Sequence, residues 1–276
     1  MRYSVPTITD WKWAMVKTEF SSQQQDMLFA LEDESWWFTY RIRLIEKLLN
    51  KYFAKVHPII DLGGGNGYSS ITLQNAGWNA SLLEPSAEGC SNARKRGVVN
   101  VINGLLNKDF EGFGEIRQIV LLDVLEHIED DRGMLGTIYD GLAKGGKLLV
   151  TVPAFTCLWS SEDDAAGHFR RYKRKALRKL MEDAGFNVLY SSYFFSFLFF
   201  PIYIIRHVFE KLGLLKKVKD RSKDEELRIK RQQFGRQNFF VERILKILES
   251  LEEKRILSGK TLGIGSSIVI VCEKPL

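Results

Sequence analysis

The feature that most constrains the fold is a glycine-rich segment that follows directly on a short apolar run. Residues 56–62 predict a strand, and this strand passes through Asp61 into Gly63, Gly65 and Gly67 before a helical stretch begins. Glycine allows the backbone to turn sharply and allows a ligand to approach more closely than a β-carbon would permit. The segment therefore predicts a ligand-binding loop at the carboxyl edge of a parallel sheet.

Short apolar or β-branched runs alternate with helical stretches through the rest of the chain, as they do in βαβ units. The expected strands are residues 56–62, 79–83, 98–103, 118–122, 147–152, 187–193 and 267–273, with helices at 69–76 and 175–184. The fourth of these strands is apolar enough to be buried on both faces. This pattern predicts an α/β fold built on a mostly parallel sheet.

Length and composition favour a single elaborated domain. The chain has 276 residues, of which 45% are hydrophobic and 27% charged, so it can bury a full core. Cys90, Cys157 and Cys272 are widely spaced and form no Cys-x-x-Cys pair, so neither a disulfide framework nor a zinc site is expected. Charged residues interrupt the N-terminal segment, so no signal peptide is expected and the sequence predicts a cytoplasmic protein.

The strand pattern divides the chain into segments. Residues 1–55 are largely helical and rich in tryptophan, whereas residues 56–276 carry the alternating pattern. Residues 194–262 form a helical insertion before the last strand, with leucines and isoleucines at helical spacing from Phe239 to Leu251. We therefore expect an N-terminal helical segment, a sheet domain, and a helical insertion within that domain.

The spacing within the glycine loop does not fit two common nucleotide motifs. A Gly-x-Gly-x-x-Gly fingerprint fails because its sixth position is Tyr68 counted from Gly63 and Ser70 counted from Gly65, and a Gly-Lys-Ser/Thr phosphate loop is absent. S-adenosylmethionine (SAM) has no pyrophosphate but has a cationic amino-acid end. An acid at the start of the loop, Asp61, suits such a cation.

Glu84 gives a second indication of the ligand. It lies just after the second expected strand, 23 residues beyond Asp61. A carboxylate at this point can accept hydrogen bonds from both hydroxyls of a ribose. The alternative is a solvated acid in a turn, but the combination with the Asp61 loop favours the ribose role.

With these motifs, the segment from Ile59 to about Glu273 resembles the class I SAM-dependent methyltransferases. The resemblance implies a Rossmann-like seven-stranded sheet with an antiparallel last strand, helices on both faces, and SAM as the cofactor. The residues that it assigns to the cofactor are Asp61, Gly63, Gly65, Gly67, Glu84 and Asp123. The family often has Gly-Asp after its third strand, whereas this chain has Asn103-Gly104-Leu105-Leu106, so Leu105 is expected to give the adenine an apolar or backbone contact.

A titratable group follows the fourth expected strand. His127 is expected to act as a general base or to orient the acceptor, because an imidazole titrates near neutral pH; the alternative is a histidine that only holds the loop. The segment also partly resembles a quinone O-methyltransferase motif that is associated with a divalent metal, for which Asp123, Glu126 and His127 could be ligands. Because the sulfonium already activates the methyl group, no metal is expected.

A second cluster follows the fifth expected strand. His168, Arg170, Arg171 and Tyr172 together suit an anionic or hydroxyl-rich acceptor, since arginine can hold a carboxylate or phosphate through two hydrogen bonds. We expect His168 to take part in catalysis and the other three to bind the acceptor. The alternative is that the arginines are the solvated start of the next helix.

The aromatic segment ahead of the sheet resembles a bacterial methyltransferase subgroup that often occurs in polysaccharide or glycolipid contexts. Trp37 and Arg41 match its pattern and are expected to bind the acceptor, whereas Ser35 and Thr39 depart from it. The segment is expected to form a lid that covers the cofactor and excludes water. The alternative is that its tryptophans dock a helix onto the sheet.

The apolar run at 194–205 is too short to span a bilayer. It is expected to line an acceptor pocket or a homodimer contact, or else to lie, with basic residues up to 219, at the inner face of a membrane. Taken together, the sequence predicts methyl transfer from SAM to an oxygen, or less readily a nitrogen or carbon, of a small-molecule or lipid- or saccharide-linked acceptor. Nucleic acid is not expected as a partner because an Asn-Pro-Pro-Tyr-type loop is absent; a nucleic-acid methyltransferase and a non-catalytic SAM-binding protein are the alternatives.

Overall fold

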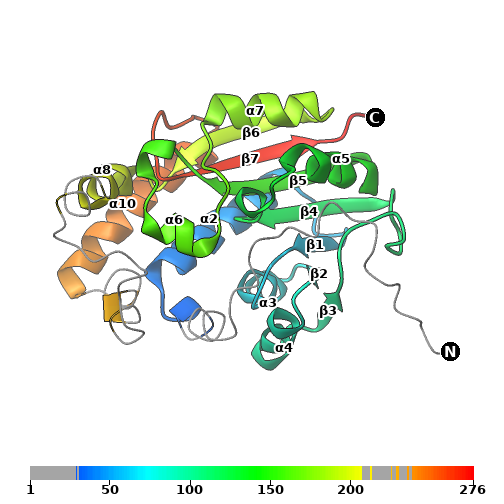
Figure 1. Ribbon diagram of the computed structural model, residues 1–276, viewed down its shortest axis with the longest axis horizontal. Helices are drawn as coiled ribbons and strands as arrows, with labels where there is room; N and C mark the ends of the chain where they lie inside the picture. The colour runs from blue at the N-terminus through cyan, green and yellow to red at the C-terminus, as the bar shows by residue number, and fades with distance from the viewer. Residues whose placement is uncertain are drawn as a thin grey trace.

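The computed structural model describes residues 31–206 and 238–276, together with positions 29, 212, 225, 228, 229 and 235. Within these residues, seven strands form one sheet in the order β3-β2-β1-β4-β5-β7-β6 (Figure 1). The strands are β1 (Ile59–Leu62), β2 (Ala80–Glu84), β3 (Asn100–Asn103), β4 (Ile116–Leu122), β5 (Leu142–Pro153), β6 (Asn187–Phe194) and β7 (Ser267–Glu273). Strand β7 runs antiparallel to β5 and β6, and the other neighbours are parallel, which confirms the predicted sheet.

Helices connect the strands and cover the sheet. The α-helices are α2 (Trp36–Tyr52), α3 (Tyr68–Asn75), α4 (Ala87–Arg96), α5 (Asp131–Gly141), α6 (Ser161–Ala166), α7 (Arg174–Asp183), α8 (Phe199–Ile204) and α10 (Phe239–Leu257). Short 3₁₀ turns follow three of the strands: η1 (Leu125–His127), η2 (Thr156–Leu158) and η3 (Ser196–Leu198). The site described below is formed by the segments that follow β1, β2, β4 and β5.

The central strand β4 shows why the sheet needs helices on both faces. Its side chains alternate, so that Ile119 and Leu121 pack in the cluster with residues of α5 and α7, whereas Val120 and Leu122 pack in the cluster with residues of α2 and α10. None of these four side chains is more than 8% exposed. Burial on both faces is therefore a property of the structure, as the apolar run predicted.

The ends of some strands differ from the predicted ones. Strand β1 begins at Ile59, not at residue 56, because Val56 is 82% exposed and packs on nothing in the core. Strand β5 begins at Leu142, five residues before the predicted start, because Leu142 pairs with Ile116 ahead of a register irregularity. Apolar content alone does not reveal where a strand with an irregular register begins. Strand β7, whose pairing with β5 is regular, has the predicted bounds.

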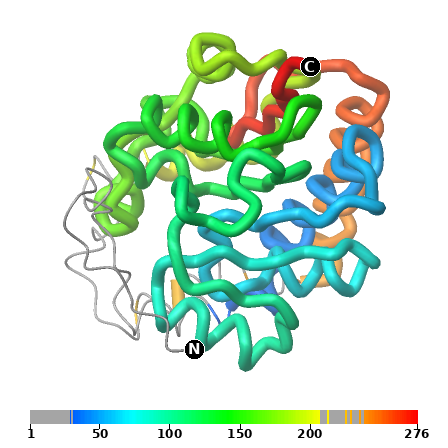
Figure 2. The backbone as a smooth tube through the Cα atoms, turned by 90° about the vertical axis from the view of Figure 1, so that its right-hand side faces the viewer, coloured from blue at the N-terminus to red at the C-terminus, as the bar shows by residue number. Residues whose placement is uncertain are grey.

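Helix α2 precedes the first strand in the sequence and contacts α10, the helix that precedes the last strand. Ser35 caps its N-terminus by accepting a hydrogen bond from the Phe38 amide. It runs beside α10, seen as neighbouring blue and orange tubes in Figure 2, and Arg43 forms ion pairs with Glu249 and Glu253 across this contact. The helix predicted near residues 239–251 is confirmed as α10, whereas residues 1–28 and residue 30 of the predicted N-terminal segment lie outside the described residues.

No described helix has both the length and the apolar content that crossing a membrane requires.

Candidate functional site

The glycine loop after β1 has the backbone conformation that its sequence requires. Gly65 and Gly67 have φ values of +54° and +76°, a region that side chains with a β-carbon rarely occupy. A β-carbon on Gly67 would lie 2.7 Å from the Ala93 β-carbon of α4, so this glycine allows α4 to pack closely. A β-carbon on Gly65 would meet nothing within 4 Å among the described residues, so Gly65 borders open space where a ligand can approach the backbone.

Asp61 lies beneath this loop as a buried acid. One of its carboxylate oxygens, Oδ2, accepts a hydrogen bond of 2.7 Å from the Ser70 hydroxyl, whereas Oδ1 is buried with no hydrogen-bond partner among the described residues. Burial raises the pKa of Asp61 to about 6, against the lowering effects of Ser70 and Arg41. A buried carboxylate with one oxygen that lacks a hydrogen-bond partner, beneath a loop whose Gly65 borders open space, suits a cationic ligand group, which the amino-acid end of SAM provides.

Glu84, at the end of β2, holds the loop from its other side. Its two carboxylate oxygens accept hydrogen bonds from the Gly65 amide at 3.0 Å and from the Ser86 amide at 2.8 Å. Burial raises the pKa of Glu84, and these two hydrogen bonds oppose the rise. The predicted adenine contact, Leu105, follows β3 and is 44% exposed.

Asp123 follows the carboxyl end of β4 and forms an ion pair with Arg41 of α2. It has a φ of 54°, unusual for a residue with a side chain, and its Oδ2 lies 2.9 Å from Arg41 Nη2 of α2. Its Oδ1 accepts a hydrogen bond of 2.8 Å from the Thr151 hydroxyl, which itself accepts one of 3.1 Å from Arg41. Arg41 is 8% exposed, so the N-terminal helix places a buried positive charge among the residues predicted to bind the cofactor.

Trp37, one turn before Arg41 on α2, lies in an aromatic cluster. Its ring stacks on Phe195 with the ring centroids 5.3 Å apart, and the Arg41 guanidinium lies 5.3 Å from the Trp37 ring centroid. The ring thus contacts both the start of the insertion and the ion-paired arginine. This geometry agrees with the docking alternative for the tryptophans and leaves the acceptor role of Trp37 a prediction.

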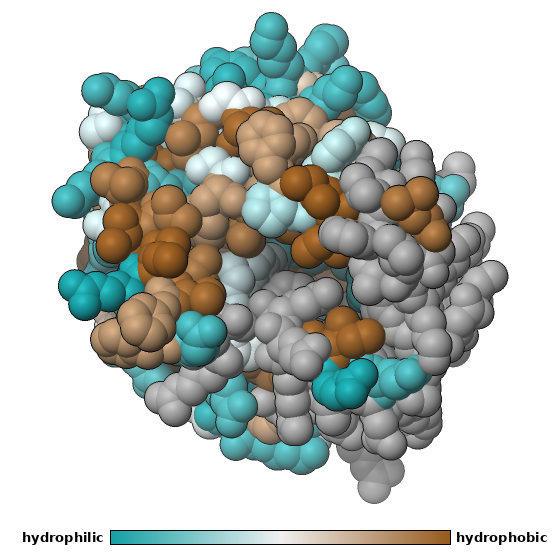
Figure 3. All heavy atoms as spheres, turned by 90° about the vertical axis from the view of Figure 1, so that its left-hand side faces the viewer, coloured by the Kyte–Doolittle hydropathy of each residue, from teal (hydrophilic) through white to brown (hydrophobic). Residues whose placement is uncertain are grey.

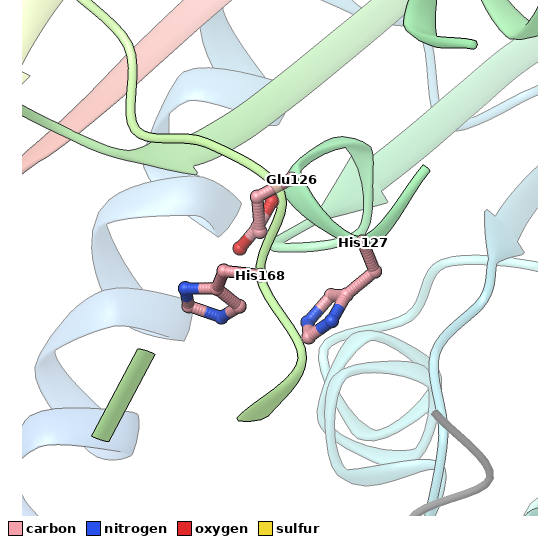
Figure 4. A group of neighbouring side chains, drawn as sticks. All are labelled: Glu126, His127 and His168. Atoms are coloured by element: carbon pink, nitrogen blue, oxygen red, sulfur yellow. The ribbon is translucent and has the colours of Figure 1, made fainter. Parts of the chain in front are cut away.

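The segment after β5 forms a closed loop that returns to the sheet. Ala154 pairs with Tyr172 as an isolated bridge, and the Phe169 amide donates a hydrogen bond of 2.8 Å to the Glu126 carbonyl. This second contact ties the loop to η1 and brings together the two histidines predicted for catalysis. The rings of His127 and His168 have centroids 4.7 Å apart and meet edge to face (Figure 4).

Asp163 is the buried centre of this loop. Its Oδ1 lies 2.9 Å from His168 Nδ1 and 2.7 Å from Arg171 Nε, and its Oδ2 lies 3.3 Å from Arg206 Nη1. Burial would raise the pKa of Asp163, but the hydrogen bonds from His168 and Arg171 outweigh it and hold the pKa at about 2. An ionised carboxylate can only accept, so His168 Nδ1 is the donor in this hydrogen bond, which leaves Nε2 as the ring nitrogen that does not contact Asp163.

The pKa values of His127 and Glu126, the two polar groups beside His168, are both shifted in the direction that favours the neutral form. Burial, and then the neighbouring His168, lower the pKa of His127 to about 4. Burial, and then the charge of Asp123, raise the pKa of Glu126 well above its ordinary value. The ligand atoms of Glu126, His127 and His168 lie within 4.8 Å of one another, so within the described part of the chain this is a set that could hold a divalent metal ion.

The predicted acceptor-binding residues after β5 divide into two groups. Arg170 pairs with Asp131 at 2.7 Å, and the Tyr172 hydroxyl donates to the same carboxylate at 3.0 Å. Arg171 donates to Asp163 and to the Ala154 carbonyl. These contacts hold the loop against α5 and the end of β5. Of the four residues predicted for the acceptor side of this loop, His168 is the one whose side chain contacts His127.

Two polar residues of the site were missed at the level of sequence. Thr151 is hydrogen-bonded to Asp123 and Arg41, and its signal would have been a polar residue inside an otherwise apolar strand. Asp163 forms a capping box with Ser160 at the start of α6, a pattern that is legible in sequence. The pattern does not show that the capping acid also orients a histidine.

Known proteins agree with a methyltransferase fold. Residues 37–191 match the family described as "Methyltransferase domain", and because this is more than half of the chain, the protein belongs to that family. No curated protein matches the sequence.

Solved structures extend the comparison. A Haemonchus contortus phosphoethanolamine N-methyltransferase 2 in complex with SAM is 14% identical with a TM-score of 0.58, and the match covers 99% of this chain but 62% of that one. A possible histamine N-methyltransferase from Thermotoga maritima is 19% identical with a TM-score of 0.51, over 92% of this chain and 99% of that one. The cyclase SpnF is 14% identical with a TM-score of 0.58, over 94% of both chains. At these identities the similarity shows a shared fold.

The family and the site together define a SAM-dependent methyltransferase. The residues present fit the cofactor, because Gly65 borders open space and Asp61 has a buried oxygen without a partner. Bound SAM would lie against the loop formed by these residues, with Glu84 at the end of the neighbouring strand. The acceptor is a separate question, which depends on the residues around His168.

Proposed function

We propose that the protein transfers the methyl group of SAM to a hydroxyl oxygen of a small-molecule or lipid- or saccharide-linked acceptor, with His168 as the general base. The observation that carries the proposal is the 2.9 Å hydrogen bond between Asp163 and His168, beside His127. A carboxylate on Nδ1 fixes the tautomer of an imidazole and stabilises the imidazolium that forms when Nε2 takes a proton. Asp163 supplies both effects because it is ionised and 1% exposed.

In this scheme the acceptor oxygen gives its proton to His168 and receives the methyl group of SAM. SAM supplies a methyl group that the positive sulfur already activates. His168 Nε2 accepts the proton of the acceptor hydroxyl as the oxygen forms its bond to the methyl carbon and the carbon–sulfur bond breaks. His127 stays neutral, because its pKa is about 4, and orients the acceptor by hydrogen bonding. Hydroxyl acceptors need this base, whereas a neutral amine can attack before it loses a proton.

The N-terminal helix is assigned to the donor side. Asp61 and the ion pair of Arg41 with Asp123 receive the amino-acid end of SAM, and Glu84 receives the ribose hydroxyls. The support for this is that Asp61, Glu84 and Asp123 lie at the carboxyl ends of β1, β2 and β4, and that the Arg41 charge acts on both Asp61 and Glu126. Trp37, Arg170, Arg171 and Tyr172 shape the acceptor side indirectly, by holding α2 and the loop after β5 in place.

The test compares His168→Gln with His57→Gln, an exposed histidine before β1. Each variant is screened for S-adenosylhomocysteine release over a panel of phenols, sugar hydroxyls, lipid-linked saccharides and amines. We expect wild-type turnover on a hydroxyl acceptor, a loss of about 10² to 10⁴-fold in kcat for His168→Gln, and no loss for His57→Gln. SAM affinity measured in parallel should not change in either variant. Turnover only on amines, or full activity of His168→Gln, would refute the assignment.

A further inference from the structure

Helix α10 is amphipathic in the reverse sense to an ordinary surface helix. Three of its four buried residues are acids, Glu249, Glu252 and Glu253, and none of these is more than 6% exposed. A helix that packs on a core normally turns its apolar stripe inward. Here the buried side carries three acids beside the single buried apolar residue Ile256, so the exposure of the helix's other apolar residues needs another explanation.

The buried acids have defined partners, which shows that this orientation of the helix is specific. Glu252 accepts hydrogen bonds from the Tyr40 hydroxyl and from the Phe195 amide, each at 2.7 Å. Glu249 and Glu253 pair with Arg43 of α2 at 2.7 and 2.6 Å. Rotation of α10 to bury its apolar side would break all of these contacts and leave buried donors without acceptors.

The outward side of α10 is consequently apolar. Phe240, Ile244, Ile247 and Leu251 follow one another at spacings of four, three and four residues and are 77%, 58%, 54% and 61% exposed. This spacing places them in one stripe along the helix. Scattered exposed apolar residues are ordinary, but a continuous stripe of this kind marks an interaction surface.

Basic residues flank the stripe. Arg243, Lys246, Lys254 and Arg255 are all exposed on α10, whereas its remaining acid, Glu242, is half-buried. The outer face of α10, defined as this apolar stripe and the four basic residues, therefore carries positive charge and no exposed acid. Helix α8 lies at the same end of the molecule (Figure 1) and adds the exposed side chains of Phe200 and Ile204. Figure 3 shows apolar residues gathered on this side.

We propose that the outer face of α10 lies on an anionic lipid surface. An apolar stripe bordered by lysine and arginine is what an interfacial helix presents to acyl chains and to negative headgroups. A second copy of the chain is a poor occupant, because a two-fold contact would set the same four positive charges against one another. A bound lipid surface satisfies the apolar stripe and the charges at once.

This surface goes beyond the proposed function and does not depend on it. The membrane contact predicted from sequence covered residues 194–219, of which 207–211 and 213–219 lie outside the described residues. The structure supports a contact on a different element, α10, through residues that the sequence had indicated only as a helix.

The test is sedimentation of the full chain with vesicles of phosphatidylcholine, with and without phosphatidylglycerol. Wild type should bind the anionic vesicles, and high salt should weaken the binding. The double variant Phe240→Gln/Ile247→Gln should lose at least about tenfold in vesicle affinity, a change of about 1.4 kcal/mol. The variant Arg243→Gln/Lys254→Gln should lose the preference for phosphatidylglycerol.

The matched control is Val99→Gln, because Val99 is 81% exposed but precedes β3, far from α10 in sequence. This variant should bind vesicles as wild type does, and all variants should keep the wild-type circular dichroism spectrum. Failure of wild type to bind anionic vesicles would overturn the proposal, as would wild-type binding by Phe240→Gln/Ile247→Gln. A dimer in analytical ultracentrifugation that this variant dissociates would assign the face to a second copy instead.

Discussion

Replacing Asp61 with asparagine should make the protein more stable and a poorer binder of SAM. Asp61 is fully buried, and one of its oxygens has no hydrogen-bond partner in the part of the chain that the structure describes. Its ionised form is therefore costly in the absence of a cationic ligand. Asparagine keeps the shape and an acceptor for the Ser70 hydroxyl while it removes the charge.

The magnitude follows from the pKa of Asp61. Burial raises it from 3.8 to about 6, and each unit corresponds to 1.36 kcal/mol. A carboxyl group whose folded pKa is raised destabilises the fold above that pKa and has no effect below its unfolded value. The cost is therefore absent below about pH 4, grows between about pH 4 and 6, and reaches about 3 kcal/mol at neutral pH. A weaker hydrogen bond from Ser70 offsets part of the gain in the variant.

The assay is urea denaturation of wild type and Asp61→Asn, without ligand, at several pH values from about 4 to 8. The variant should be more stable by about 1 to 3 kcal/mol at neutral pH, and the difference should vanish toward pH 4. Exposed Asp109→Asn is the matched control and should show no such difference. A destabilised Asp61→Asn protein at neutral pH, or a difference that does not change with pH, would refute the reasoning.

Three further predictions follow from the same contacts. Glu84→Gln should weaken S-adenosylhomocysteine binding by about 10 to 100-fold in calorimetry, because a neutral amide replaces a charged acceptor, and unchanged affinity would contradict the ribose assignment. Glu252→Ala should lower the free energy of unfolding by at least about 3 kcal/mol, because it leaves the Tyr40 hydroxyl and the Phe195 amide buried without an acceptor, whereas exposed Ser250→Ala should change it little. Dialysis against EDTA should leave methyl transfer unchanged, because the sulfonium needs no metal; turnover that returns only with a divalent ion would instead give Glu126, His127 and His168 a metal-binding role.

The regular part of the fold could be predicted from sequence because its signals are local. The apolar run of β4 indicated burial on both faces, and Ile119 and Val120 do pack in opposite clusters. The sharp turn after Asp61 could be predicted equally well, because positive φ values restrict the residue type at Gly65 and Gly67 to glycine. These features depend on a few neighbouring residues and on little else.

The rest depends on contacts between distant segments. The spacing from Phe239 predicted a helix but could not show which side faces inward, because that depends on Arg43 and Tyr40 of α2, about 200 residues away. His127 and His168 were separate candidates in the sequence. They meet because the Phe169 amide binds the Glu126 carbonyl, a contact that no local pattern encodes.

The central claim is that the loop from Asp61 to Gly67 binds SAM, and calorimetric titration of the purified chain tests it most directly. Titration with SAM and with S-adenosylhomocysteine should show one site per chain, and NAD⁺ and ATP should give no heat of binding, because the loop lacks their phosphate-binding spacing. Neither adenosyl compound binding, or tighter binding of NAD⁺ or ATP, would contradict the account.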